Sequence, residues 1–169
     1  LPMGIVLREL IDRHAGGVLG GRKLKAVVPG GLSSAILTAD EIDVKMDFDS
    51  LKAAGTMGGS GGVIVMDETV SMVEALRVTM QFFAHESCGQ CTPCREGTSW
   101  LDRILSRMVR GKGERNTIDH MLDIGAYLGG TTICGLADGA QMALLSYLKK
   151  FRSEFEEFIE KGNLQSVSS

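Results

Sequence analysis

Three cysteines at every third residue are the feature of this sequence that offers the most chemistry. Cys88, Cys91 and Cys94 form a C-x-x-C-x-x-C motif, and the chain has one further cysteine, Cys134. Thiolates bind soft metals and iron–sulfur clusters, and a 4Fe–4S cluster takes four of them. The number of cysteines and their three-plus-one spacing predict that all four together hold one 4Fe–4S cluster.

Zinc is the competing ligand for these thiols. Structural zinc sites favour two pairs of cysteines, whereas three of the four lie together here. The alternative that stays open is a zinc-stapled interaction module without a redox function. A disulfide scaffold is disfavoured, because three cysteines within seven residues close no long loops.

The segment that carries the three cysteines is expected to be a loop wrapped around the bound group. Gly89 loosens its first turn, and Pro93 disfavours a helical conformation at Thr92. Free backbone N–H groups in such a loop can donate to cluster sulfurs. Cys134 falls between two expected helices, so the two connections can meet at one end of an antiparallel bundle.

The polar residues near the motif suggest smaller roles. Arg95 could offset the negative charge of a thiolate-bound cluster, and His85 could be a second-layer donor or cap the preceding helix. His14 and His120 have no partner at ligand spacing and are expected on the surface. No pair of carboxylates suited to acid–base catalysis is evident.

Residues 1–66 mix short apolar runs with turns and predict a small α+β domain whose first strand is truncated. A short helix is expected over 7–14. Strands are expected at 24–28, 36–38 and 42–46, with a buried strand at 63–66. The glycine cluster at 55–62 precedes its strand, whereas a phosphate-binding loop follows one, so a packed turn is favoured.

Residues 67–169 have helical periodicity and predict a four-helix bundle that carries the cluster. Asp67 or Thr69 is expected to cap the first helix, and Asn116 or Thr117 the third. The last helical region, 138–160, is expected to break near Arg152. The methionines in these helices are expected to fill the core.

Composition excludes several classes of function. The 169 residues carry a formal charge of −3, and no basic stripe or block is evident, so nucleic acid is not an expected partner. Apolar stretches fall short of the ~20 residues that a membrane span needs, so no membrane insertion is expected. The chain begins at Leu1, which suggests a fragment.

The segment Glu86-Ser87-Cys88-Gly89-Gln90-Cys91-Thr92-Pro93-Cys94-Arg95-Glu96-Gly97 resembles the iron–sulfur motif of the flavin- and NADH-binding subunit of respiratory complex I. The resemblance extends to 15–17, 23–31, 63–67 and 151–156, and so to nearly the whole chain. It implies a β-grasp domain of the soluble-ligand-binding type before the helical bundle. It also implies a 4Fe–4S cluster on Cys88, Cys91, Cys94 and Cys134.

The resemblance further implies an electron relay within an NADH:quinone oxidoreductase. In that family NADH reduces FMN, and the cluster passes single electrons onward to clusters of partner subunits. The FMN and NADH sites belong to an N-terminal domain that this chain lacks. The implied partners are that flavin domain, a thioredoxin-like subunit and a larger multi-cluster subunit, on the cytoplasmic side of the inner membrane.

One departure from the family pattern leaves a second parent enzyme open. Cys134 is followed by Gly135-Leu136-Ala137-Asp138, where complex I members usually have Ala-Leu-Gly-Asp. Diaphorase subunits of NAD-linked hydrogenases and formate dehydrogenases share the cysteine motif. The same relay module in such an enzyme is therefore an alternative.

Overall fold

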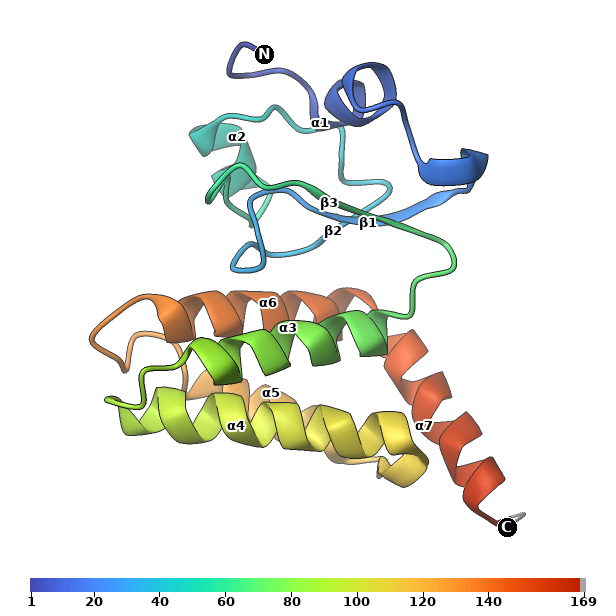
Figure 1. Ribbon diagram of the computed structural model, residues 1–169, viewed down its shortest axis with the longest axis vertical. Coiled ribbons are helices and arrows are strands. Elements are labelled where there is room, and N and C mark those ends of the chain that lie inside the picture. Colours follow the sequence, from blue (N-terminus) through green and yellow to red (C-terminus); the bar gives the residue numbers. More distant parts are fainter. Residues whose placement is uncertain (168–169) are drawn as a thin grey trace. The chain divides into compact units, whose positions relative to one another are not determined.

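The computed structural model describes the backbone of residues 1–167 and the side chains of residues 1–162. The last two residues of the expected bundle domain lie outside the described part. The chain divides into two compact units, Leu1–Val70 and Ser71–Ser169. The first unit holds a sheet and short helices, and the second holds five longer helices (Figure 1).

The first unit is built on a three-stranded antiparallel sheet in the order β2-β1-β3. Strand β1 (Leu24–Val28) lies between β2 (Leu37–Thr38) and β3 (Ile64–Asp67), and Ala26 faces Thr38 on one side and Met66 on the other. The remaining elements of this unit are helix α1 (Leu7–Glu9), its π-helical continuation Leu10–His14, a 3₁₀ turn Leu19–Gly21, and helix α2 (Phe48–Ala53).

Apolar side chains from the helix and the sheet form the core of this unit. Leu7 and Ile11 of the helical turn pack with Val27, Leu37 and Ile42, and all five are buried. The expected helix over 7–14 and the strand over 24–28 are confirmed. Removing this apolar surface from water is the main term that holds so small a unit together.

The strand expected over 42–46 is wrong, and the reason lies in its partner segment. Met46 does bond to residues near the N-terminus, and Lys45 forms a single bridge with Val6. The facing segment becomes helical at Leu7, so the bonds from the Leu7 and Arg8 N–H groups to Val44 and Ile42 do not build a regular ladder. Sequence reasoning also missed helix α2, whose N-cap is Asp47: the carboxylate accepts from the Ser50 N–H at 2.7 Å.

Strand β3 is not buried as expected, because it forms an edge of the sheet. Ile64 is 39% exposed and Val65 37% exposed, whereas Met66 is buried.

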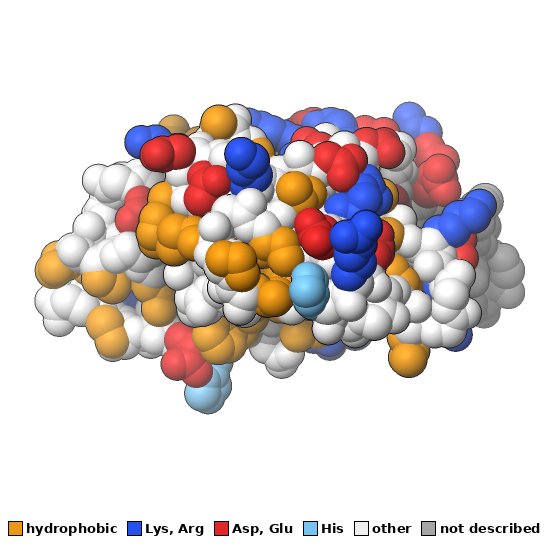
Figure 2. Space-filling model, turned by 90° about the horizontal axis from the view of Figure 1, so that it is seen from above, with side chains coloured by type: hydrophobic (Ala, Val, Ile, Leu, Met, Phe, Trp, Pro, Cys, Tyr) orange, Lys and Arg blue, Asp and Glu red, His pale blue; other side chains and the backbone are white. Residues whose placement is uncertain are grey.

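Other apolar side chains are exposed in this unit, and hydrophobic atoms gather among charged ones on the surface in Figure 2. Met3 and Phe48 line a cavity of about 270 Å³ with Met46, Leu51 and the loop 58–61.

The glycine cluster packs backbone against backbone. Gly59 has a φ of +42°, and a Cβ on it would collide with the carbonyl oxygen of Gly30. Gly30 itself has no room for a Cβ, because the Met57 carbonyl and the Ser34 hydroxyl lie against it. The Ser60 N–H also donates to the Gly30 carbonyl at 3.1 Å, which joins the loop 58–61 to the turn at Gly30. This is a packed turn, in which glycine is needed for close approach.

The second unit packs α3 (Met72–Glu86), α4 (Thr92–Arg107), α5 (Thr117–Ala126) and α6 (Leu136–Lys150) against one another. A π-helical turn, Met108–Lys112, continues α4, and a fifth helix, α7 (Arg152–Val167), packs on that turn. The break between α6 and α7 falls at Phe151, close to the expected position. None of the helices in the described part is long and apolar enough to cross a membrane.

The first long helix starts later than expected. Ser71, rather than Asp67 or Thr69, is its N-cap and accepts from the Glu74 N–H. Asp67 instead ends β3 and bonds to Thr69 and Arg22. Hydrogen bonds from Thr69 hold the pKa of Asp67 at about 2, so this carboxylate is charged and committed to its turn.

Buried apolar side chains fill the space between the helices. Met72, Met80, Met108 and Met121 are buried, which confirms their expected place in the core, whereas Met142, expected there too, is only half-buried. Tyr147 is also buried, and burial raises the pKa of its hydroxyl to about 12. The Thr79 hydroxyl, buried as well, donates to the Ala75 carbonyl at 2.8 Å.

Candidate functional site

The first three cysteines occupy the connection from α3 to α4 and the first turn of α4. Cys88 lies in a short loop in which Gly89 has a φ of +80°. Cys91 has an extended backbone and is the N-cap of α4, and Cys94 is already inside that helix. The expectation of a loop across the whole motif, with a non-helical Thr92, is wrong. Pro93 is tolerated in the first turn, where its missing N–H has no helical partner to lose.

Cys134 lies in the connection from α5 to α6, just before Leu136 begins α6. The loop is held by its own polar groups. The Gly130 N–H donates to Asp138 Oδ1 at 2.7 Å, and the Thr132 hydroxyl donates to the Cys134 carbonyl at 2.9 Å. The side chain of Cys134 is exposed. In Figure 1 the two connections lie at the same end of the helices.

One cavity of about 170 Å³ brings the four cysteines together. Its walls are made by both connections and the helix ends beside them, namely Glu86, Ser87, Cys88, Gln90, Cys91, Cys94, Thr132, Cys134 and Leu136. Cys94 is buried at the base, Cys91 is half-buried, and Cys88 and Cys134 are exposed. The thiols thus range from the interior of the unit to its surface.

Two protein groups lie within hydrogen-bond range of the sulfurs. Ser87 Oγ is 3.2 Å from Cys94 Sγ, and the Ile133 backbone N–H donates to Cys91 Sγ at 3.4 Å. The second bond links the two connections directly, because these residues are 42 positions apart. Donors of this kind stabilise a thiolate and tune the potential of a metal centre bound to it.

Arg95 forms hydrogen bonds with the cysteine loop and its neighbours, and none of its bonds goes to a cysteine sulfur. Its guanidinium donates to the Gly89 carbonyl at 2.7 Å, to Thr92 Oγ1 at 3.4 Å and to Glu96 at 3.0 Å. The Glu96 carboxylate cancels part of the charge that sequence reasoning assigned to Arg95 for offsetting a cluster. No pattern in the sequence signals the bond to Gly89, because it depends on how the loop folds back.

His85 and the other histidines stay away from the cavity. His85 Nδ1 is 3.1 Å from Glu86 Oε1, and its side chain is exposed and does not line the cavity. His14 and His120 are exposed, as expected. His85 therefore contacts the Glu86 side chain at the end of α3, and no hydrogen bond among the described residues makes it a cap of that helix.

The arrangement of the thiols bears on which group they could hold. Among the described residues, no three cysteine, histidine, aspartate or glutamate side chains converge on a point that could hold one metal ion. A zinc site needs such convergence, with each sulfur about 2.3 Å from the ion. A 4Fe–4S cluster binds each thiolate through a different iron, so its four sulfurs stand further apart. Four thiols around one cavity are the donor set that a 4Fe–4S cluster takes.

Comparison with known proteins finds the same region. Residues 74–158 match the family described as the NADH-ubiquinone oxidoreductase-F iron-sulfur binding region. The chain is 50% identical over 161 residues to the NADH-quinone oxidoreductase F subunit 2 of Rhizobium meliloti, and 46% identical over 161 residues to the corresponding F subunit of Mycobacterium tuberculosis. These matches cover 95% of this chain but 38% and 36% of the relatives.

A solved structure is similar over the same extent. The chain superposes on an NAD⁺-reducing [NiFe]-hydrogenase, crystallised in the H₂-reduced state, with a TM-score of 0.83 and 25% identity. The match covers 94% of this chain and 26% of the hydrogenase chain. The chain therefore spans well under half the length of each of these three proteins.

Proposed function

Because the chain belongs to the family of the NADH-ubiquinone oxidoreductase-F iron–sulfur binding region, we propose that it is an electron relay. It holds one 4Fe–4S cluster on Cys88, Cys91, Cys94 and Cys134 and passes single electrons within an NADH:quinone oxidoreductase. The observation that carries the proposal is the single cavity that all four cysteines line.

A bound 4Fe–4S cluster would supply reversible one-electron chemistry at this site. The residues of the chain would hold and tune it. Ser87 Oγ and the Ile133 N–H would donate to the sulfurs of Cys94 and Cys91, which favours extra negative charge there. Leu136 gives the cavity an apolar wall, which limits water and strengthens these bonds.

We also propose a fold for each unit: the first is a β-grasp domain, and the second is the cluster-bearing helical bundle. The antiparallel sheet around β1, with the helical turn 7–14 packed on it, supports the first assignment. The position of the cysteines at the ends of α3, α4 and α6 supports the second.

The activity of the whole enzyme would require protein segments beyond this chain. The relatives are F subunits of NADH-quinone oxidoreductases, and their additional length would hold the FMN and NADH sites. The partners proposed for the relay are that flavin domain, a thioredoxin-like subunit and a larger multi-cluster subunit. The location proposed is the cytoplasmic face of the inner membrane, peripheral to it.

A second parent enzyme is supported by the structural comparison. The NAD⁺-reducing [NiFe]-hydrogenase shares the fold of this chain over 94% of its length. In a diaphorase subunit of that kind the cluster would have the same ligands and the same one-electron function. The curated relatives at 46–50% identity favour the quinone-linked enzyme.

The test is an assay of iron and zinc on anaerobically purified or reconstituted protein, with its visible spectrum. About four irons per chain and a broad absorption that bleaches with dithionite are expected. About one zinc per chain after reconstitution with iron and sulfide, and no bleaching, would contradict the relay and favour the zinc-stapled module.

A further inference from the structure

The arginines of this chain fall into two sets with different surroundings. Six of the ten form ion pairs, and those six are Arg8, Arg13, Arg22, Arg77, Arg95 and Arg152. The other four have no ion pair with any residue of the described part, and all four lie between positions 103 and 115. The arginines without an ion pair in the described part are therefore gathered in one segment.

That place is the end of α4, the π-helical turn and the connection to α5. Lys112 is a fifth cation there, also without an ion pair among the described residues, and Glu114 is the single acidic residue of the segment 103–115. All five cations are exposed. We call them the basic end, and its residues are Arg103, Arg107, Arg110, Lys112 and Arg115. These charges form no continuous stripe in the sequence, because single apolar and polar residues separate them.

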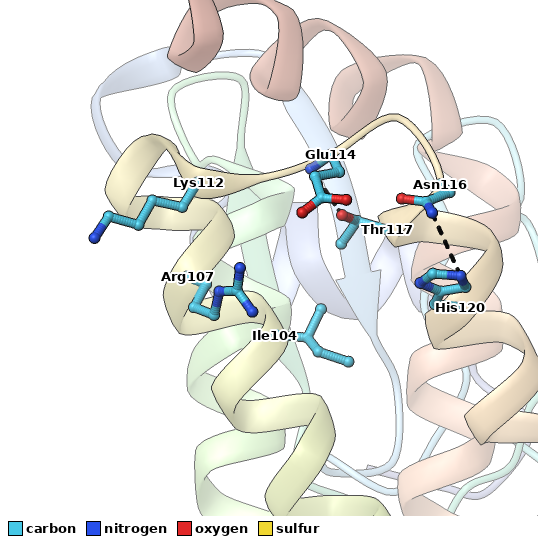
Figure 3. A pocket seen from close by; sticks show the side chains of 7 residues that line it. All are labelled: Ile104, Arg107, Lys112, Glu114, Asn116, Thr117 and His120. Atoms are coloured by element: carbon cyan, nitrogen blue, oxygen red, sulfur yellow. Dashed lines mark hydrogen bonds between the residues drawn. The ribbon is translucent and has the colours of Figure 1, made fainter. Parts of the chain in front are cut away.

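A cavity of about 100 Å³ lies within the basic end (Figure 3). Hydrogen-bond donors surround it, and its lining residues are Ile104, Arg107, Lys112, Glu114, Asn116, Thr117 and His120. The Glu114 carboxylate points into the space between Arg107 and Thr117 in Figure 3. No described side chain forms an ion pair with this carboxylate, so the cations around the cavity are not neutralised at short range.

Leaving these charges together has a cost that a partner would remove. Arg103 and Arg107 are four residues apart on one helical face, where like charges repel. The chain as a whole is negative, at −3, so the basic end is a local reversal of its charge. Concentrated charge of one sign attracts a partner of the opposite sign and speeds its association.

The surroundings favour an acidic protein surface over a lipid or a nucleic acid. The segment 101–126 has no exposed large apolar side chain to insert into a bilayer, and Trp100 is one turn nearer the cysteines. Glu156 and Glu160 of α7 line a cavity with Arg115, which limits the positive surface to the length of a short acidic segment. Arginine predominates over lysine, and its planar fork matches a carboxylate with two bonds.

We propose that the basic end is a docking surface for an acidic segment of a partner protein. Carboxylates of the partner form paired hydrogen bonds with the exposed arginines, and one enters the cavity beside Arg107 and Lys112. This surface is separate from the cysteine cavity, because Arg107 follows Cys94 by thirteen residues of helix, about 20 Å.

The test measures binding of a fluorescein-labelled decaglutamate peptide by anisotropy, with the cluster-loaded protein at low and high salt. The wild-type chain is expected to bind and to lose affinity as salt rises, because exposed charges are screened. Arg107→Glu/Lys112→Glu should bind about tenfold more weakly. The matched control Lys52→Glu/Lys149→Glu makes the same change in net charge at exposed lysines elsewhere and should stay within about twofold of the wild type.

A second variant separates bidentate pairing from bulk charge. Arg103→Lys/Arg107→Lys/Arg110→Lys keeps every charge but loses the fork, and about threefold weaker binding is expected. Absence of decaglutamate binding at low salt, or equal losses in test and control variants, overturns the proposal. Tighter binding of decathymidylate or of phosphatidylglycerol vesicles than of decaglutamate overturns it too, in favour of a phosphate-bearing partner.

Discussion

The two ends of helix α4 differ in how their functional side chains are surrounded. At its start, two connections fold toward each other, and the groups around the thiols are joined by hydrogen bonds. At its end, five cations face solvent without ion pairs in the described part of the chain. The cysteine end is held by short-range bonds, whereas the basic end depends on long-range charge.

This difference predicts which end responds to which change. Short-range hydrogen bonds are little affected by salt, and losing one atom disrupts them. Exposed charges are screened within a Debye length and tolerate the loss of one member. Substitutions should therefore have large, local effects at the cysteine end and small, salt-dependent effects at the basic end.

Cys91→Ser should have the largest effect of all. Cys91 combines half-burial with the bond from the Ile133 N–H, and serine replaces a soft thiolate by a hard hydroxyl. Iron is expected to fall from about four per chain to near background, with loss of the visible absorption. Ser106→Ala, which lies on α4 beyond the site, is the control and should keep its iron. Full iron in Cys91→Ser would remove Cys91 from the ligand set.

Arg95→Gln should loosen the cysteine loop without removing a ligand. The variant loses the charged bond to the Gly89 carbonyl, worth roughly 1 kcal/mol at this partly exposed site. Alkylation of the cysteines in cluster-free protein should then be about fivefold faster. Arg77→Gln, which removes an ion-paired arginine from α3, should leave that rate unchanged. Equal rates in Arg95→Gln and the wild type would show that the loop is held without Arg95.

Ser87→Ala should shift the reduction potential while iron content stays unchanged. The hydroxyl 3.2 Å from Cys94 Sγ favours the more negative, reduced state, so its removal should lower the potential. A difference of at most ~1 kcal/mol corresponds to about 20–40 mV for one electron. Redox titration followed by electron paramagnetic resonance measures it. A potential equal to that of the wild type, or higher, would contradict a donor role for Ser87.

Arg107→Gln should have the smallest effect, and it should stabilise the chain rather than disrupt it. It relieves repulsion within the basic end, so the free energy of unfolding should rise by less than about 0.5 kcal/mol, and less still at high salt. Urea titration with and without added salt measures this. Arg152→Gln breaks pairs with Asp119 and Glu156 and should instead destabilise the chain. Marked destabilisation by Arg107→Gln would mean that the basic end has an internal partner after all.

The sequence predicted elements well where one signal dominated. Strand 24–28 is an apolar run closed by Pro29 and Gly30, and the break near Arg152 interrupts a long helical pattern. The prediction of a strand over 42–46 was wrong although the segment has a strand-like pattern and forms strand-like bonds, because the segment that faces it becomes helical at Leu7. Such outcomes depend on a distant segment, which local patterns do not describe.

The candidate site also has features that the sequence predicted and features that only the folded structure shows. Cysteine count and spacing named the four residues that line the cavity, because metal ligands must be of a few types. The bond from Arg95 to Gly89 and the pairing of Arg95 with Glu96 required the folded loop. The basic end was missed because its charges form no continuous run, and only their exposure and lack of ion pairs within the described residues make them stand out.

The split between Cys94 and Cys134 has a consequence for synthesis of the protein in the cell. Forty residues separate these cysteines, so at about 5–20 residues per second the fourth thiol leaves the ribosome roughly 2–8 s after the first three. During that interval the nascent chain presents three thiols and no complete cavity. At the proposed cluster site, delivery of iron and sulfide would therefore be a late event, and the unfinished site would depend on reducing surroundings to keep its thiols from oxidation.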